Sequence, residues 1–164
     1  MSRTRALTAT VFAALALTAC SARDAAPAPV PQAAVRSDNG VHLSTKEVGT
    51  LGYVVTDIGG FTLYRFDKDS AEPPRSECSG PCATAWPPAL AEGGDVSSDG
   101  MDRALIGTFV RADGSTQLTL AGRPLYRFAK DVKPGDAKGQ GVGGTWFAVA
   151  PDGAKAAGAE DDGY

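Results

Sequence analysis

Histidine is almost missing from this 164-residue chain, since His42 is its only one. A histidine-based catalytic triad would depend on this residue, which we expect to be solvated and without a catalytic partner. The glycines do not follow a phosphate-binding spacing, and no pair of carboxylates lies in a recognisable glycosidase context. We therefore expect no enzymatic activity and assign no catalytic residues.

Basic clusters and long apolar runs are missing as well. The 16 Lys and Arg residues are outnumbered by 19 Asp and Glu residues and form no basic block, so nucleic acid is not an expected partner. The apolar stretch at residues 6–18 is too short to span a bilayer by itself. Cysteine occurs only three times, as Cys20, Cys78 and Cys82, so each cysteine can be considered separately.

The N-terminus has the organisation of a lipoprotein signal peptide. Arg3 and Arg5 precede the apolar stretch, which ends at residues 17–20 in Leu-Thr-Ala-Cys, a sequence similar to a bacterial lipobox. We expect residues 1–19 to be removed and Cys20 to carry acyl chains such as palmitate, enough for stable anchoring. The protein would then lie at the outer face of the bacterial cytoplasmic membrane. A simple secretory signal is the alternative.

Composition separates three regions beyond the signal peptide. Residues 20–42 are rich in Ala and Pro and lack apolar periodicity, which indicates a lipid-anchored tether, either a functional spacer or the link that any lipoprotein needs. Residues 43–153 provide about 110 residues for a single small domain. Residues 154–164 are polar and acidic, and we expect them to be disordered.

A ten-residue motif occurs twice in the domain. Residues 60–69 read GFTLYRFDKD and residues 122–131 read GRPLYRFAKD, with seven identical positions. A tryptophan follows each copy at a similar distance, Trp86 after the first and Trp146 after the second. The chain therefore contains an internal duplication, with repeat 1 at about residues 49–92 and repeat 2 at about residues 104–151.

Further motifs accompany the first copy, namely Cys-x3-Cys-Ala at residues 78–83 and Trp-Pro-Pro at residues 86–88. With Tyr-x-Phe-x-x-Asp, they make residues 49–151 similar to the bacterial secreted-repeat lipoproteins, a family described by a Yx(FWY)xxD motif. The resemblance implies an extracytoplasmic lipoprotein and brings no established activity. Gly139 and Gly143 stand near where Cys78 and Cys82 would fall in the second copy, and their backbone flexibility is expected to replace a bridge there.

Extended segments rich in β-formers alternate with glycine turns through the domain. Strands are expected at residues 53–57, 61–66, 105–111, 116–120, 124–128 and 145–150. Prolines between Ala71 and Glu77 should prevent a regular ladder, and residues 134–144 should form a long loop. The expected fold is mainly β: a small single domain of two related repeats, built from short strands and glycine turns, with one short helical turn expected at residues 82–86.

The repeated aromatic residues allow two interpretations. Alternate residues of a strand share a face, so Tyr64 and Phe66, like Tyr126 and Phe128, should point the same way. Together with the two tryptophans they would form the core, each contributing about 1.5–3 kcal/mol on full burial. The alternative is a pair of exposed platforms that stack on a ring, sugar or quinone-like ligand.

The repeated aspartates also allow two interpretations. Asp69 and Asp131 end their motifs, where a side-chain oxygen can cap the turn after the strand. The alternative is a carboxylate that contacts a ligand or cation. Asp67 with Asp69 is reminiscent of a calcium site, but Ala129 replaces the first aspartate in the second copy, so no metal site is assigned.

Cys78 and Cys82 lie in an exported domain with a glycine and a proline between them, so a local disulfide is the leading interpretation. Closing so small a loop stabilises by only about 2 kcal/mol, which indicates a role in shaping the segment before Trp86. A strained, redox-active disulfide is the alternative. A metal site would need further soft ligands, and the chain offers only Met101 and His42.

The combination of a lipid anchor, a duplicated β domain and no catalytic group favours a non-catalytic binding or interaction module. Its partners would be the membrane, through the lipid on Cys20, and an unknown protein or small molecule. We expect a monomer without cofactor or metal. A surface redox or electron-transfer protein that uses Cys78 and Cys82 is the alternative function.

Overall fold

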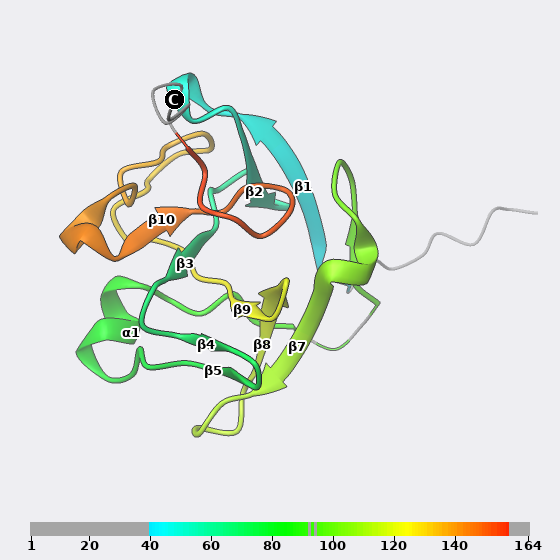
Figure 1. The fold of residues 1–164 in the computed structure, drawn as a ribbon, viewed down its shortest axis with the longest axis vertical. Coiled ribbons are helices and arrows are strands. Elements are labelled where there is room, and N and C mark those ends of the chain that lie inside the picture. Colours follow the sequence, from blue (N-terminus) through cyan, green and yellow to red (C-terminus); the bar gives the residue numbers. More distant parts are fainter. Residues whose placement is uncertain (1–39, 92, 94, 158–164) are drawn as a thin grey trace, which may run out of the picture. The chain divides into compact units, whose positions relative to one another are not determined.

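Glycine and proline interrupt the chain every few residues, so the strands between them are short. The computed structural model describes residues 40–91, 93 and 95–157, which belong to a unit spanning Arg36–Tyr164 (Figure 1). The strands of this part are β1 (His42–Glu47), β2 (Tyr53–Asp57), β3 (Tyr64–Phe66), β4 (Ser70–Ala71), β5 (Pro74–Arg75), β6 (Ser97–Ser98), β7 (Ile106–Val110), β8 (Thr116–Leu120), β9 (Arg123–Pro124) and β10 (Trp146–Ala148). The helices are α1 (Pro81–Ala85) and the 3-10 turns η1 (Gly49–Leu51), η2 (Arg103–Leu105) and η3 (Val142–Gly144).

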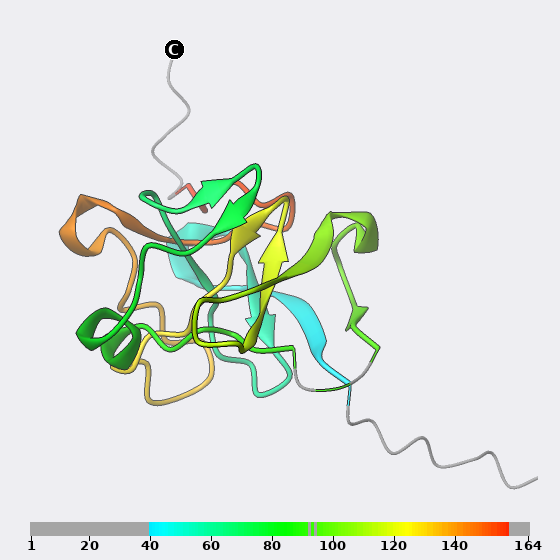
Figure 2. The ribbon, with the colours of Figure 1, turned by 90° about the horizontal axis from the view of Figure 1, so that it is seen from below.

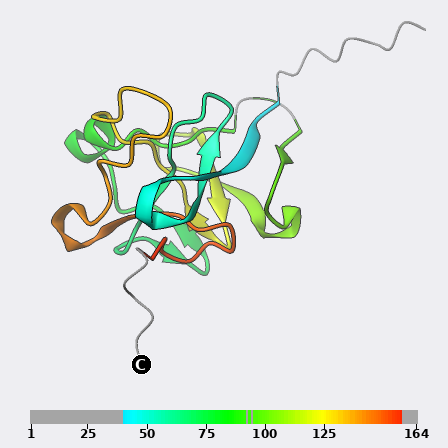
Figure 3. The same ribbon diagram turned by 90° about the horizontal axis from the view of Figure 1, so that it is seen from above.

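Each repeat contains a hairpin, β1–β2 in the first and β7–β8 in the second. The two registers correspond, since Thr45 lies opposite Val55 and Thr108 lies opposite Leu118. The β1–β2 hairpin is cyan to teal in Figure 3, and the β7–β8 hairpin is lime to yellow. The two halves therefore share the same local structure.

The repeats exchange strands rather than folding separately. β3 of the first repeat pairs antiparallel with β10 of the second, with Phe66 opposite Trp146. In the reverse direction, Arg127 N donates to Pro87 O at 2.8 Å, so the segment after β9 lies on the residues that follow Trp86. The remaining sheets have the orders β2-β1-β6, β7-β8-β9 and β4-β5, and the β4–β5 hairpin contacts β9 (Figure 2). This exchange makes the duplication a single domain.

Two apolar clusters fill the interior. One contains seven aliphatic residues, namely Leu43, Val55, Leu63, Leu118, Leu120, Leu125 and Val149. The other contains the six repeated aromatic residues and four smaller ones, namely Tyr64, Phe66, Trp86, Tyr126, Phe128, Trp146, Val54, Cys78, Ala148 and Ala156. The aromatic motif therefore supplies most of one core.

The mainly β class is confirmed, and α1 is the one short α-helix of the described residues. The structure adds β1, which begins at His42, a residue that the sequence places in the tether. Ser44–Glu47 is polar, and pairing with β2 rather than intrinsic propensity makes this segment a strand. The strand predicted at residues 124–128 is wrong beyond Pro124, because Tyr126 makes single bridges to two different segments instead of a ladder.

Two segments that were expected to be irregular are ordered by pairing. β4 and β5 form a two-residue ladder despite the prolines, which a short edge ladder tolerates. Lys155 bridges to Val149, and Ala156 is only 3% exposed within the aromatic cluster. The expected disordered tail therefore does not begin at residue 154, because the chain turns back at Gly153 (φ 86°) onto the core. Residues 158–164 lie outside the described part of the chain.

Candidate functional site

The two copies of the tyrosine motif meet backbone to backbone. Tyr64 N donates to Tyr126 O at 2.8 Å, and Tyr126 N donates to Tyr64 O at 2.9 Å. Tyr64 lies in β3, and Tyr126 lies two residues after the end of β9. Both tyrosine side chains are fully buried. The repeated motif thus forms the contact between the two halves of the domain.

Each tyrosine hydroxyl donates to the aspartate of the other repeat. Tyr64 Oη lies 2.5 Å from Asp131 Oδ2, and Tyr126 Oη lies 2.6 Å from Asp69 Oδ2. Both aspartates are buried, since Asp69 is 5% exposed and Asp131 is 8% exposed. A buried carboxylate is costly unless it is hydrogen-bonded. The crossed pairs therefore satisfy four polar groups inside the core.

The other oxygen of each carboxylate holds the loop that follows its own motif. Glu77 N donates to Asp69 Oδ1 at 2.8 Å, and Lys138 N donates to Asp131 Oδ1 at 3.0 Å. The carboxylates therefore do not cap the turn directly after the strand, as the sequence suggested, because the amides that they bind lie eight and seven residues further on. Each aspartate ties its own loop to the opposite repeat.

Burial shifts the pKa of both tyrosines and of Asp69. It raises the pKa of Tyr64 and of Tyr126, and the hydrogen-bonded carboxylates of Asp131 and Asp69 add to the two shifts. Burial also raises the pKa of Asp69, against the lowering effect of the Tyr126 hydroxyl and the Glu77 amide. The tyrosines therefore act as neutral hydrogen-bond donors at physiological pH.

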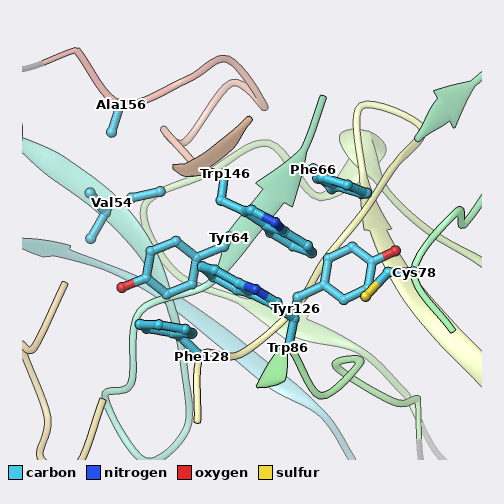
Figure 4. Packing of buried hydrophobic residues seen from close by; sticks show 10 residues of the cluster. Val54, Tyr64, Phe66, Cys78, Trp86, Tyr126, Phe128, Trp146 and Ala156 are labelled. Carbon is cyan, nitrogen blue, oxygen red and sulfur yellow. The ribbon is translucent and has the colours of Figure 1, made fainter. Parts of the chain in front are cut away.

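Four rings form a continuous stack across the repeats (Figure 4). Trp86 and Trp146 lie face to face, with ring centroids 3.9 Å apart and 1° between their planes. Phe66 stacks on Trp146 at 4.2 Å, and Phe128 stacks on Trp86 at 4.1 Å. Each phenylalanine therefore packs on the tryptophan of the other repeat.

The tyrosine rings complete this cluster edge-on. Tyr64 meets Trp86 at 5.4 Å and 76°, and Tyr126 meets Trp146 at 5.1 Å and 86°, both favourable T-shaped arrangements. None of the six rings is more than 8% exposed. The rings thus form core, and the interpretation as exposed ligand platforms is wrong.

The aspartates of the first motif do not converge on a cation. Asp67 pairs with Lys155 Nζ at 2.8 Å near the surface, whereas Asp69 points inward to Tyr126. Within residues 40–91, 93 and 95–157, no group of three or more His, Cys, Asp and Glu residues could hold a metal ion. What the motif provides is hydrogen bonding between the two repeats.

Cys78 and Cys82 form a disulfide, with Cα atoms 5.2 Å apart. Pro81 begins α1, a position that suits proline, and Trp86 N donates to Cys82 O at 2.8 Å where α1 ends. Cys78 is fully buried against the rings, and Cys82 is partly exposed. The bridge fixes the segment that leads into Trp86. Residues 76–85 are called the disulfide loop below.

A buried arginine fastens the disulfide loop to the second repeat. The side chain of Arg111 is 5% exposed and donates to Cys78 O at 2.7 Å, to Ser76 Oγ at 3.1 Å and to Gln117 Oε1. Ser76 Oγ also lies 2.7 Å from Tyr126 Oη. The polar network therefore extends from the disulfide loop to one of the crossed tyrosine–aspartate pairs.

The first repeat has apolar residues at the matching places. Val48 matches Arg111, because each donates its backbone N–H across the turn of its hairpin. The strand registers likewise match Val54 with Gln117. Val54 belongs to the aromatic cluster and Val48 packs against it. The duplicated frame is thus surrounded by apolar contacts in one half and by a polar network in the other.

The loop of the second repeat, residues 137–144, is closed by tight packing and is called the glycine loop below. Gly139 takes the place of Cys78. Each of them directly follows the residue whose backbone N–H donates to the aspartate of its motif. A Cβ atom on Gly139 would lie 2.6 Å from Tyr64 Cε1 and 2.8 Å from Trp86 Cη2. This glycine is therefore required for close approach rather than for flexibility, whereas Gly143 has a φ of 61° that favours glycine.

A cleft of about 590 Å³ opens between the disulfide loop and the end of the β7–β8 hairpin. Its lining combines apolar and charged residues, among them Ala83, Phe109, Val110, Arg75, Glu77 and Asp113. Val110 is 70% exposed. The cleft thus borders the residues by which the two repeats differ.

His42 has polar neighbours that the sequence did not suggest. Nδ1 lies 2.8 Å from Ser97 Oγ, and Nε2 lies 3.3 Å from Asp99 Oδ2. Asp99 is 81% exposed, so the contact lies at the surface and contributes little energy. It helps to hold β6 against β1.

Sequence reasoning missed the Arg111 network and the crossing of the hydroxyl bonds. A charged residue at the end of a strand is usually solvated, and Arg111 carries no local signal to the contrary. An alignment of the two hairpins provides such a signal, because Val48 of the first repeat stands where Arg111 stands in the second. Cys20 lies outside the described residues, and its lipidation stays a prediction.

Comparison with known proteins agrees with the duplication. The family described as a secreted repeat of unknown function matches residues 47–90 and residues 107–150. No curated protein and no solved structure gives a significant match. The description indicates a location outside the cytoplasm, and none of the helices formed by the described residues is long and apolar enough to cross a membrane. Because the two matches cover more than half of its length, the chain belongs to this family of secreted repeats of unknown function.

Proposed function

We propose that the protein is a lipoprotein anchored through Cys20 at the outer face of the bacterial cytoplasmic membrane, and that its folded part is a non-catalytic binding or interaction module. The lipobox-like sequence at residues 17–20 and the family's description as secreted support the anchor. The partners are the membrane, through the lipid, and a protein or small molecule at the surface of the folded part.

The binding role rests on one observation: the residues that the repeats share are used inside the domain. The tyrosines and aspartates bond to one another, and the rings stack in the core. The residues that differ between the repeats, Arg111 and the disulfide among them, border the cleft instead. We infer that the shared residues build the frame and that the cleft carries the binding function.

The cleft has the composition of a protein-binding surface. Ala83 and Val110 give it apolar contact area, while Arg75, Glu77 and Asp113 place charges of both signs around it. Arg75 and Glu77 are already paired at 2.8 Å. An apolar centre with a polar rim is typical of interfaces, and walls held by a disulfide reduce the ordering cost of binding.

Site-specific photo-crosslinking in the producing cells tests the binding role. A photoreactive residue at Ala83, inside the cleft, should give one discrete adduct with the full-length lipoprotein. The same residue at Val132, which is 74% exposed but does not line the cleft, is the matched control. Equal adducts from both positions, or none from the cleft, would contradict a binding cleft.

The anchor is tested separately by Cys20→Ser. We expect this variant to lose incorporation of labelled palmitate and either to remain an uncleaved precursor or to leave the membrane fraction. Wild-type processing and membrane association of the variant would show that the anchor assignment is wrong.

A surface redox protein is the second candidate, and the partial exposure of Cys82 favours it. One thiolate of a dithiol reductant would attack Cys82 Sγ, forming a mixed disulfide and releasing the Cys78 thiolate. The second thiolate of the reductant would then attack the reductant's other sulfur in the mixed disulfide, which releases the Cys82 thiolate and forms the reductant's disulfide. Measuring the reduction potential separates the candidates. A value above about −200 mV would favour the redox function, and one below about −300 mV would favour a structural bridge.

A further inference from the structure

β7 lacks the features that normally protect an edge strand. Its five residues, Ile106–Val110, include no charged residue and no proline. Natural proteins usually place charges, prolines or bulges on such edges to prevent pairing with other chains. β8 pairs with one side of β7, and no strand of the described residues pairs with the other side. Figure 1 shows β7 at the outer side of the β7-β8-β9 sheet.

The backbone groups on this outer side are available. Arg111 N donates across the hairpin turn, so the antiparallel alternation turns the N–H and C=O groups of Thr108 and Val110 away from β8. In agreement, Leu118, which lies opposite Thr108, donates to Ala89 O instead. Within the described part of the chain, no acceptor bonds to the amides of Thr108 and Val110. These two residues can therefore bond to another strand.

The matching strand of the first repeat shows what such an edge can hold. β6 lies along the outer edge of β1 in parallel, and Asp99 N donates to Leu43 O at 3.0 Å. The end of β1 that β6 leaves uncovered carries two charges, Lys46 and Glu47. One repeat thus covers its edge with an extended segment and charges, whereas the other leaves a bare, uncharged edge of the same hairpin geometry.

A pocket lies at each end of β7. Val110 lines the cleft beside the disulfide loop at the hairpin end. A second pocket, of about 320 Å³, is lined at the other end by Ile106 and Thr108 together with Arg103 and Asp95. A strand of five residues spans roughly 16 Å, so one extended peptide along β7 reaches both pockets.

We propose that the outer edge of β7 binds an extended peptide segment of a partner protein by β-strand addition. The peptide bonds to the backbone of Thr108 and Val110, runs parallel to β7 as β6 runs parallel to β1, and places an uncharged aliphatic side chain beside Val110. Main-chain bonds provide affinity in this mode, and the pockets select the side chains. The inference rests on the proposed binding role and names the surface responsible for it.

A random dodecapeptide library displayed on phage is the probe, with the folded lipoprotein lacking only its lipid as bait. Selected peptides are then synthesised and added to the isotope-labelled protein. We expect the amides of Thr108 and Val110, which exchange rapidly in the free protein, to become protected from hydrogen exchange. N-methylation of the peptide backbone on the bonded side should abolish this protection.

Two substitutions localise the binding. Thr108→Pro removes an outward N–H and leaves the β7–β8 bonds in place, since the residues on either side face β8. It should weaken the selected peptides about tenfold or more, as expected from one lost main-chain hydrogen bond and a blocked edge. Val110→Lys should weaken them similarly by placing a charge at the edge. Val132→Lys is its control, because the two valines are 70% and 74% exposed.

The results separate this inference from the broader proposal. Protection at Thr108 with loss of binding in Val110→Lys but not in Val132→Lys supports strand addition, even if Thr108→Pro fails to fold. Peptides that protect other residues, or no selected peptide, overturn it. A concentration-dependent dimer that Val110→Lys abolishes also overturns it, because a second copy is then the occupant. An Ala83 adduct that persists in Val110→Lys leaves the binding cleft standing while strand addition fails.

Discussion

The two repeats build the same frame but support their loops differently. In both, an aspartate accepts the hydroxyl of the opposite tyrosine and a backbone amide of its own loop. The disulfide loop is held by a covalent bridge and a buried arginine, whereas the glycine loop is held by direct packing on Tyr64 and Trp86. The shared residues therefore specify the fold, and the differing residues are where a function specific to one half can lie.

The matching positions form three pairs. They are Arg111 with Val48, Gln117 with Val54, and Ser76 with Ala137, the last because each precedes the amide that the aspartate binds. In each pair the polar residue belongs to the network that holds the disulfide loop. One half can thus replace three polar residues by apolar ones without losing the frame, which indicates that the polar network is an addition to the fold.

The aromatic stack tests the equivalence of the halves most strongly. Trp86→Ala and Trp146→Ala should each lower the free energy of unfolding by about 3–5 kcal/mol, because each removes the same central ring from a buried stack. Urea denaturation followed by circular dichroism measures both. Tyr53→Ala, at a residue that is 61% exposed, is the control and should cost far less. A difference above about 2 kcal/mol between the tryptophans would break the symmetry.

The arginine network tests the difference between the halves. Arg111→Val should cost about 2–4 kcal/mol, because Ser76 Oγ, Gln117 Oε1 and Cys78 O lose a charged donor inside the protein. Combining it with Gln117→Val and Ser76→Ala recreates around the disulfide loop the apolar residues found at the matching positions, namely Val48, Val54 and Ala137, and should recover stability to within about 1 kcal/mol of wild type.

The same denaturation experiment provides the control. Arg103→Val, at an exposed arginine, should change the free energy of unfolding by less than about 0.5 kcal/mol. If the triple variant is no more stable than Arg111→Val, the two halves are not interchangeable and the network belongs to the fold itself.

Much of the fold could be predicted because it depends on local signals. Glycine turns and β-rich runs indicate β2 and the β7–β8 hairpin, and the duplicated motif indicates the symmetry. β1 could not be predicted, since its polar sequence becomes a strand only through pairing with β2 and β6. β9 is shorter than its sequence suggests, because Tyr126 bonds to two separate segments and does not continue the ladder with β8.

The site could be predicted in its members but not in its connections. Tyr64, Asp69 and their copies are visible as a repeat, yet sequence does not tell whether a tyrosine bonds to its own aspartate or to the opposite one. That choice follows from the exchange of strands, a property of the whole fold. The role of Gly139 was misjudged for the same reason, because Tyr64 and Trp86 approach it only in the folded protein.

Alkaline titration sharpens the comparison further. Tyr64 and Tyr126 have pKa values raised by burial, so above about pH 10 the unfolded chain loses protons that the folded protein retains. Their contribution is complete below pH 10 and declines as pH rises, by about 1.4 kcal/mol per pH unit for each tyrosine. Tyr64→Phe and Tyr126→Phe should each remove one such contribution to the slope of unfolding free energy against pH.

The two slopes should be equal, because burial and a hydrogen-bonded aspartate raise the pKa of both tyrosines. Tyr53→Phe, at the exposed tyrosine, should leave the slope unchanged and serves as the control. A slope that only one of the buried tyrosines affects would show that the two pairs differ in the protein, despite their matching geometry.

The disulfide should have the smallest effect of the features that distinguish the halves. Cys78→Ala with Cys82→Ala should lower the free energy of unfolding by about 1–3 kcal/mol, because a loop this small restricts the unfolded chain only modestly. The frame should persist, since the aspartate bond to Glu77 N and the Arg111 bond to Cys78 O need no sulfur. Urea denaturation of the variant and of the reduced wild type should give similar values.

Adding Arg111→Val to the double alanine variant then decides what the bridge does. If the losses of unfolding free energy add up, bridge and arginine act independently. A larger loss means that each holds the disulfide loop in place when the other is missing. A loss above about 4 kcal/mol from the two alanines alone would contradict a local role and would make the bridge part of the shared frame.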